Sequence, residues 1–433
     1  MKKIIKLSAI LALTINLNAT QTYTSDDLIL QSLQNSPDIK ISSYNYEASK
    51  SRYDRAFSDY LPTVDLHLST GVGGVSDRQQ LLLDGDLVNN QTSLGGLSAK
   101  QLIYDFGKTG GNSDSFKFAS EAYSSEHAQF ISNKKRDVKA AYFEVLQDIS
   151  LIEVQKENVK LSEVQLYRAQ KYFTAGIRTK IDISDAKANL LYAKLALKNA
   201  EYDLKLAYTS LDKVVGFKDV KTDYVVYSAK LDFDNLYSSL SDYKLTLEES
   251  VKFAYENRDE LKKQQSKIES AKAKSTKASS DYYPNIYANG SYTHQSSDRM
   301  QNILPQEQWK VSANLDWNLY RGGATSASTQ EAEIEINKTQ TDLVYSKLSI
   351  KTQTTQAYLN VNRTKDSVEL SQSLVEVSNE KFDQANKRYE NGLSDYIELQ
   401  QARQGYIDAK ASLVVDYYSY YAAVATLDNA IGK

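Results

Sequence analysis

Apolar residues recur at every seventh position in two long stretches of this chain. In the first stretch they are Val138, Val145, Ile152, Val159, Leu166 and Phe173. In the second they are Val361, Val368, Val375, Phe382 and Tyr389. A strict seven-residue spacing keeps the apolar seam on one side of a helix. It predicts two long helices that pack as left-handed coiled coils.

Each stretch ends in a copy of the same segment. Residues 169–187, AQKYFTAGIRTKIDISDAK, are matched about 216 positions later by residues 385–403, ANKRYENGLSDYIELQQAR. Gly176 and Gly392 interrupt the helical pattern where a residue with positive φ ends one helix, and Ser, Thr or Asp follow to begin another. Each copy therefore predicts the tip of a helical hairpin.

A return helix with two seams follows each tip. The apolar seams are Ile183, Leu190, Leu197, Leu204 and Leu211 in the first copy and Leu399, Tyr406, Leu413, Tyr420 and Leu427 in the second. The small-residue seams are Ala186, Ala193, Ala200 and Ala207, and Ala402, Ala409, Asp416, Ala423 and Ala430, where Asp416 is the exception. Two seams of strict seven-residue spacing predict left-handed supercoiling, and the alanines allow neighbouring helices to approach closely.

The period changes from helical to two after each of two proline residues, Pro62 and Pro284. Val64, Leu66, Leu68 and Val72 alternate with polar residues, which predicts a strand with one apolar face. A second strand is expected over residues 93–105, and a third over 285–293. The clearest alternation is Trp309, Val311, Ala313, Leu315, Trp317 and Leu319 against Lys310, Ser312, Asn314, Asp316 and Asn318. Tryptophans at its two ends are typical of the aromatic girdles of a lipid-facing surface.

The order of these elements predicts a duplicated chain. Residues 1–19 read as a signal peptide, because lysines precede a short apolar run and Ala19 ends it. Residues 20–216 form a first repeat of helices, two strands and a long hairpin, and residues 246–433 form a second. The Asp-, Tyr- and Ser-rich residues 217–245 form a linker that we expect to pack against the helices.

Composition narrows the functional classes. The 433 residues carry 52 basic and 55 acidic side chains, a balance that does not favour nucleic acid. There is no Cys, which excludes disulfides, thiolate metal sites and a lipid-anchored cysteine. The three histidines lack ligand spacing, and no nucleophile elbow or paired acid and base is present. We therefore expect no enzyme, no cofactor and no metal.

Four membrane strands in one chain require other copies. Strands of about ten residues suit a tilted membrane strand, yet an open sheet in lipid would leave its edges unpaired. Two copies would give eight strands, whose lumen is filled by side chains, so a duct favours three copies and twelve strands. The predicted fold is mainly α with a membrane β-barrel part, in which a trimer forms a 12-stranded β-barrel continuous with a coiled-coil α-barrel.

Eight short motifs in order carry a family resemblance. They are the segments 35–38 (NSPD) and 257–260 (NRDE), Leu61-Pro62 and Tyr283-Pro284, 102–108 (LIYDFGK), 319–323 (LYRGG) and the two tips. Over nearly all of its length after the signal, the chain resembles the TolC-like outer-membrane efflux family. The resemblance implies a homotrimeric exit duct in outer-membrane lipid, with a large periplasmic part. It also implies a periplasmic adaptor and an inner-membrane transporter as partners, and export of drugs or, in type I secretion, of proteins.

Three groups of residues are predicted to carry this function. Trp309, Val311, Leu315, Trp317 and Leu319 would face lipid, and the tips Gly176, Ile177, Gly392 and Leu393 would dock the adaptor. The family places an Arg two residues after the glycine of its second repeat, with acids six and nine residues after it, at a periplasmic gate. Here the first repeat offers Arg178, Asp182 and Asp185, and the second offers Ser394, Glu398 and Gln401. Either repeat could line the gate.

Two rival functions are compatible with parts of the pattern. Heptads alone would serve a structural or adhesive coiled-coil protein, but the alternating strands argue against it. A passive outer-membrane channel is nearer, and the long hairpins disfavour it.

Overall fold

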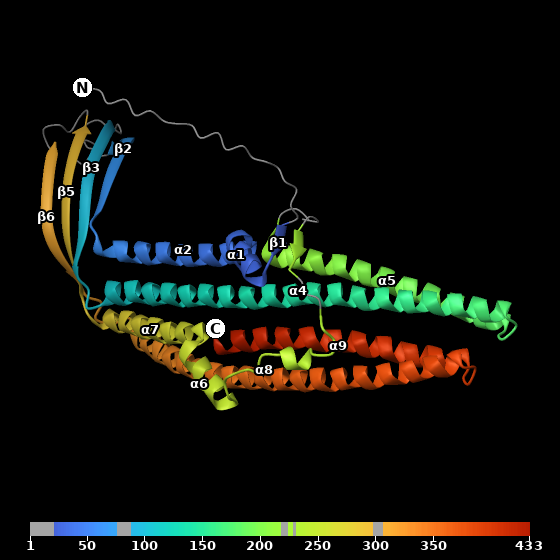
Figure 1. The fold of residues 1–433 in the computed structure, drawn as a ribbon. Helices are drawn as coiled ribbons and strands as arrows, with labels where there is room; N and C mark the ends of the chain where they lie inside the picture. Colours follow the sequence, from blue (N-terminus) through green and yellow to red (C-terminus); the bar gives the residue numbers. More distant parts are fainter. Residues whose placement is uncertain (1–20, 76–87, 218–223, 228–230, 298–305) are drawn as a thin grey trace, which may run out of the picture. The chain divides into compact units, whose positions relative to one another are not determined.

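The computed structural model describes residues 21–75, 88–217, 224–227, 231–297 and 306–433, and its elements follow one order twice (Figure 1). The predicted signal peptide lies outside these residues. The first series is α1 (Ser25–Asn35), α2 (Pro37–Phe57), β2 (Thr63–Val75), β3 (Val88–Tyr104), α4 (Lys108–Thr174) and α5 (Lys180–Val215). The second is α6 (Leu247–Asn257), α7 (Asp259–Ser279), β5 (Asn285–Ser297), β6 (Glu307–Asp316), α8 (Ala324–Glu390) and α9 (Tyr396–Ile431).

Matching helices have equal lengths, which agrees with a duplicated repeat. Both α4 and α8 have 67 residues, and both α5 and α9 have 36. Both α2 and α7 have 21 residues. Each continues into a short 3₁₀ turn, Ser58–Tyr60 or Ser280–Tyr282, which is followed directly by Leu61-Pro62 or Tyr283-Pro284. The proline disfavours helical backbone in the residue before it, so the chain leaves the helix at the same point in both repeats.

Two compact units cut across the two repeats. Unit 1 comprises the described residues within 21–37, 133–245 and 357–429, and unit 2 comprises those within 38–132, 246–356 and 430–433. Helices α4 and α8 each run from unit 2 into unit 1. The predicted repeats, 20–216 and 246–433 with the linker 217–245 between them, do not coincide with the compact units. These boundaries therefore stay a prediction.

Unit 2 contains one four-stranded antiparallel sheet with the order β2-β3-β5-β6. The two repeats join where β3 pairs with β5, and β2 and β6 are the edges. Strand β3 begins at Val88, earlier than the sequence predicted.

The predicted end of the last strand was wrong. Strand β6 ends at Asp316, which pairs with Asn285, the first residue of β5. Pro284 precedes that residue and has no N–H for a further ladder bond. Trp317 instead donates its indole N–H to the backbone oxygen of Tyr282 at 3.1 Å. Trp317 and Leu319 therefore lie beyond the strand, on the way to α8.

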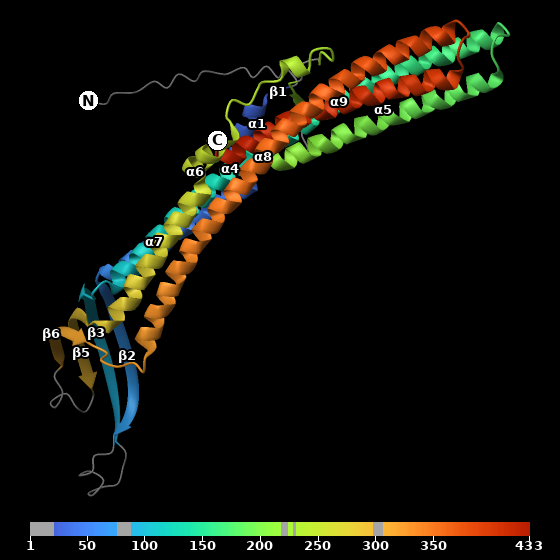
Figure 2. The same cartoon turned by 90° about the horizontal axis from the view of Figure 1, so that it is seen from below.

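Unit 1 contains residues 21–37, the linker and the parts of the two hairpins nearest the tips. Figures 1 and 2 both show α5 running back along α4 and α9 running back along α8. The predicted seam of α8 is buried from Val361 to Tyr389, and so is the alanine seam of α9. The seam of α4 is buried near Val138 and Val145 but opens toward the tip, where Phe173 is exposed. The predicted coiled-coil packing is confirmed, more fully in the second hairpin than in the first.

The linker contributes to the core of unit 1 and adds a feature that the sequence did not predict. Strand β4 (Tyr224–Val226) pairs in parallel with β1 (Gln21–Tyr23). Val226 and Leu236 are buried, and Tyr142 of α4 donates its hydroxyl to the Tyr227 backbone oxygen at 3.0 Å. The predicted packing of the linker against the helices is therefore confirmed.

Candidate functional site

Both hairpin tips end their long helices with the same hydrogen-bond pattern. Gly176 has a φ of 73° and donates its N–H to Phe173, while Ile177 donates to Tyr172, each at 2.9 Å. Gly392 has a φ of 72° and donates to Tyr389, while Leu393 donates to Arg388. This pair of hydrogen bonds around a residue with left-handed backbone is the Schellman motif. Glycine adopts that backbone without steric cost. The sequence predicted both tips correctly.

Arg178 joins the two tips to each other. Its Nη2 donates to the backbone oxygen of Ser394, the matching position in the second repeat, at 2.7 Å. Its guanidinium also lies over the ring of Tyr389, 4.9 Å from the centroid. The arginine predicted at the gate is thus engaged with the other hairpin of its own chain.

The predicted gate acids are not gathered around Arg178. Asp182 accepts the backbone N–H of Thr179 at 3.1 Å and so caps the start of α5. Glu398 lies 3.4 Å from Arg388 of its own hairpin. Asp185 and Gln401 are exposed. Within one chain these side chains stabilise helix ends and surfaces, and any ring of acids would have to come from several copies.

A buried polar network near the tips was not predicted from the sequence. Arg403 of α9 is 4% exposed and donates to Asn158, at 3.1 Å, and to Ser162 of α4. Tyr396 accepts a hydrogen bond from Asn189 at 3.1 Å. Burial lowers the pKa of Arg403 because the charged form loses its water. One signal was available: Asn158, Ser162 and Gln165 lie on one face of α4, where a coiled coil would carry apolar residues.

The strand register in unit 2 separates the sheet into two faces. Residues that pair directly across antiparallel strands share a face. Ile286 pairs with Leu315, Gly290 with Val311 and Tyr292 with Trp309. On β2 the same alternation places Val64, Leu66, Leu68 and Val72 on one side, and all four are exposed. The other face carries Ser312 and Asn314, which are half-buried. A single chain therefore exposes a broad apolar sheet face.

Aromatic side chains gather where the sheet meets the helices. Phe106 stacks on Tyr283 with centroids 5.0 Å apart and meets Tyr104 edge-on at 4.7 Å. Phe106 has a φ of 55°, the one positive value among the described residues other than glycine. A bulky residue adopts this backbone at a cost of about 1–3 kcal/mol, so the ring contacts hold it there.

The remaining features give no sign of a metal centre or a helical membrane span. Within the described ranges, no three His, Cys, Asp or Glu side chains come together as a metal ion would need. None of the helices in that part of the chain has an apolar run long enough to cross a bilayer.

The duplicated hairpins and the four-stranded sheet agree with a match over most of the sequence. Residues 28–217 and 251–433 match the family model of the outer membrane efflux protein. The chain belongs to the outer membrane efflux protein family. It is therefore an efflux channel of the outer membrane, and its family is one of channels and not of enzymes.

Three outer-membrane proteins are similar over most or all of this chain. Outer membrane protein TolC of Vibrio cholerae is 22% identical over 436 residues, which cover 100% of this chain and 96% of that protein. The Campylobacter jejuni CmeC outer membrane channel has a TM-score of 0.82 at 15% identity, covering 94% of this chain and 85% of its own. VceC of Vibrio cholerae has a TM-score of 0.80 at 15% identity, covering 94% and 96%. The two structures show the shared fold.

Proposed function

We propose that three copies of this chain form an exit duct that passes cargo from an inner-membrane transporter through a periplasmic adaptor to the outside. The sheet supports several copies because β2 and β6 are open edges. A sheet in lipid must close on itself, and four strands per chain close into twelve when three copies meet. The apolar face, with Trp309, Val311 and Leu315, then faces lipid and the polar face lines the lumen.

The observation that carries the proposal is an uncovered stripe on α5. Leu191, Leu195, Tyr202 and Leu206 follow one another along that helix, and each is more than half exposed. Their counterparts in α9 include Ile407 and Tyr418, which are buried against α4. A helix that buries this face in one repeat and leaves it bare in the other lacks a neighbour.

The missing neighbour has its own bare stripe on α8. Val154 and Leu161 of α4 pack in the core that also holds α9. The matching residues of α8, Leu370 and Val377, are 71% and 64% exposed. The α5 stripe of one copy therefore fits the α8 stripe of the next, as α9 fits α4 within one chain. Repetition of this contact around an axis closes a coiled-coil α-barrel.

Native mass spectrometry of the detergent-solubilised protein tests this assembly. We expect three chains, and a stable monomer with full strand content would contradict the proposal. Leu315→Arg and Asn314→Arg test the two sheet faces, because neighbouring residues of one strand point to opposite sides. An arginine on the lipid side near the bilayer midplane costs about 2–4 kcal/mol, whereas one on the lumen side costs little. Equal loss of folded protein from both variants would reject the face assignment.

The tips are the proposed docking site for the adaptor. Ile177 and Leu393 follow the two glycines and are 63% and 70% exposed, although a hairpin tip needs no apolar side chain there. Leu393→Asp should abolish export while the trimer persists. The matched control Ser394→Ala keeps the tip backbone and should export normally. Normal export by both variants would assign these residues to closing the hairpin only.

Gating is proposed to depend on Arg178, which already ties the tips together. In a trimer, Asp182, Asp185 and Glu398 would each form a ring of three like charges that attracts cations. In single-channel recordings, neutralising these acids should lower the cation selectivity. Gln401→Glu adds a negative charge and should raise it. Unchanged selectivity in all variants would remove the gate from these residues. Cargo of either class, drugs or proteins, is compatible with this duct.

A further inference from the structure

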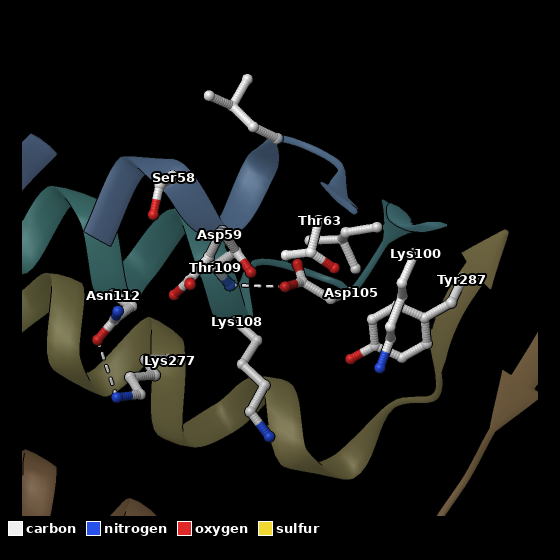
Figure 3. A pocket seen from close by; sticks show the side chains of 12 residues that line it. Ser58, Asp59, Thr63, Lys100, Asp105, Lys108, Thr109, Asn112, Lys277 and Tyr287 are labelled. Carbon is white, nitrogen blue, oxygen red and sulfur yellow. Dashed lines mark hydrogen bonds between the residues drawn. The ribbon is translucent and has the colours of Figure 1, made fainter. Parts of the chain in front are cut away.

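A cavity of about 430 Å³ lies in unit 2 where the sheet meets the helices (Figure 3). Three lysines from three different elements line it: Lys100 of β3, Lys108 of α4 and Lys277 of α7. Figure 3 shows their ammonium groups along one side of the view, with Tyr287 and Asn112 beside them. The cavity therefore brings Lys277 together with two lysines that precede it by more than a hundred residues.

Two of the three lysines have uncharged partners. Lys108 forms an ion pair with Asp281 at 2.7 Å. Lys277 instead donates to the amide oxygen of Asn112 at 2.9 Å, and Lys100 lies over the ring of Tyr287, 4.0 Å from the centroid. Neither an amide nor an aromatic ring cancels a full charge, so Lys100 and Lys277 keep donors and charge for another group.

Two carboxylates also line the cavity, and one of them is committed to the backbone. Asp105 is buried and accepts the N–H groups of Gly107, at 3.2 Å, and Thr109, at 2.7 Å. It therefore caps the start of α4 and offers little to the lysines. Asp59 is the other acid, on the exposed turn before β2. The lining therefore carries three lysines against two carboxylates, and backbone N–H groups hold one of these carboxylates, Asp105.

The register assigns this cavity to the polar face of the sheet. Lys100 pairs with Thr63 on one side and Asn289 on the other, and Leu102 pairs with Tyr287. Tyr287 in turn pairs with Asn314, which belongs to the polar face. Val64 and Ile286, one position along each strand, point to the apolar face. A ligand of this cavity is therefore reached from the side of the sheet away from lipid.

We propose that this cavity is an anion-binding site in the wall of the duct, which takes phosphate or carboxylate groups of soluble molecules. The assignment rests on the proposed trimeric duct, in which the polar face lines the lumen. Lys100 of β3 and Lys277 of α7 supply charge-assisted hydrogen bonds to the anion. The ring of Tyr287 holds the Lys100 side chain in place. Three copies place a ring of such sites around the lumen, the arrangement that favours anions in channels.

Calorimetric titration of the detergent-solubilised full chain with pyrophosphate tests the site directly. We expect binding by the wild type and about hundredfold weaker binding by Lys100→Gln with Lys277→Gln, because two charge-assisted hydrogen bonds are removed. Lys310→Gln is the matched control: it lies on the polar face of β6, outside the cavity, and should bind like the wild type. Equal affinity in the double variant and the control, or no binding by the wild type, would overturn the assignment.

Single-channel recording separates this inference from the proposed function. If the protein forms pores, pyrophosphate should lower their conductance in the wild type and the Lys310→Gln control but not in the double variant. If pyrophosphate does not change the conductance of wild-type pores, the anion site is rejected and the proposed duct is retained. If no pores form, the duct proposal fails, and the calorimetric result still decides whether the cavity binds anions. The single variants Lys100→Gln and Lys277→Gln carry the test if the double variant does not fold.

Discussion

The hairpins α4–α5 and α8–α9 have equal lengths and the same hydrogen-bond pattern at their tips but bury their side chains differently. Helix α9 buries most of its apolar residues within its own chain, where Val414 and Leu427 have no exposed surface. Helix α5 buries its alanine seam but leaves Leu191 and its neighbours bare. The two hairpins thus have the same helix lengths, but their return helices are covered by different neighbours. One return helix has its neighbour within the chain, and the other requires a second copy.

The largest effect expected from this comparison is at Ile407 and Leu191, which occupy the same place in α9 and α5. Ile407→Asp places a carboxylate in the core, and loss of a buried isoleucine alone costs about 2–5 kcal/mol. We expect little folded protein. Leu191→Asp should leave the chain folded by circular dichroism but monomeric by native mass spectrometry. Equal folding and equal trimer content in the two variants would remove the distinction between the helices.

A smaller effect is expected at Arg403 and its counterpart Lys187. Arg403 is buried with Asn158 and Ser162, whereas Lys187 is exposed. Arg403→Ala leaves buried acceptors without a donor and should lower the free energy of unfolding by about 1–3 kcal/mol. Lys187→Ala should change it by less than about 0.5 kcal/mol. Urea denaturation measures both, and matching midpoints would show that the polar network does not stabilise the hairpin pair.

The tips differ at Arg178 and Ser394, which are counterparts and also touch each other. Arg178→Ser places serine at this position in both tips and removes the hydrogen bond to the Ser394 backbone oxygen. We expect higher open conductance in single-channel recordings and a change in unfolding free energy of about 1 kcal/mol or less. Ser394→Ala is the control, because the bonded atom belongs to the backbone. Conductance that rises equally in both variants would contradict a role for this bond.

The smallest effect is a pH dependence at Asp148, where the second hairpin has Thr364. Burial, then Glu144 and Asp203, raises the pKa of Asp148 to about 6. The folded chain therefore holds this proton while the unfolded chain releases it, so stability is full below about pH 4 and falls as pH rises toward 6. Solvent screening limits the effect to about 1 kcal/mol.

Urea midpoints at several pH values test this dependence. Asp148→Asn should remove the fall between pH 4 and 6, whereas Glu376→Gln, an exposed acid on α8, should retain it. A wild-type midpoint that stays level over this range would contradict the shifted pKa.

The sequence predicted the elements whose periodicity is long and repeated. Val361 to Tyr389 fixed the phase of α8, and Gly176 and Gly392 marked both tips, because such patterns depend on local geometry. The sequence could not show that strand β6 ends at Asp316, since this depends on Pro284 of the neighbouring strand. It also could not find the pairing of β1 with β4, because three-residue strands have no readable period. The burial of Arg403 and the bare stripe of α5 depend on which helices become neighbours, which one sequence does not specify.

The core of unit 1 draws on four distant parts of the chain. Tyr23, Val145, Leu211 and Tyr418 all belong to it, and β1 pairs with a strand near residue 225. A polypeptide is synthesised and exported from its N-terminus. The core of unit 1 therefore cannot be completed until α9, the last helix, has been exported. Contacts between such distant residues form slowly, and the apolar seams stay accessible to other chains until they do. We therefore expect newly exported chains of this protein to need factors that keep them apart until the core closes.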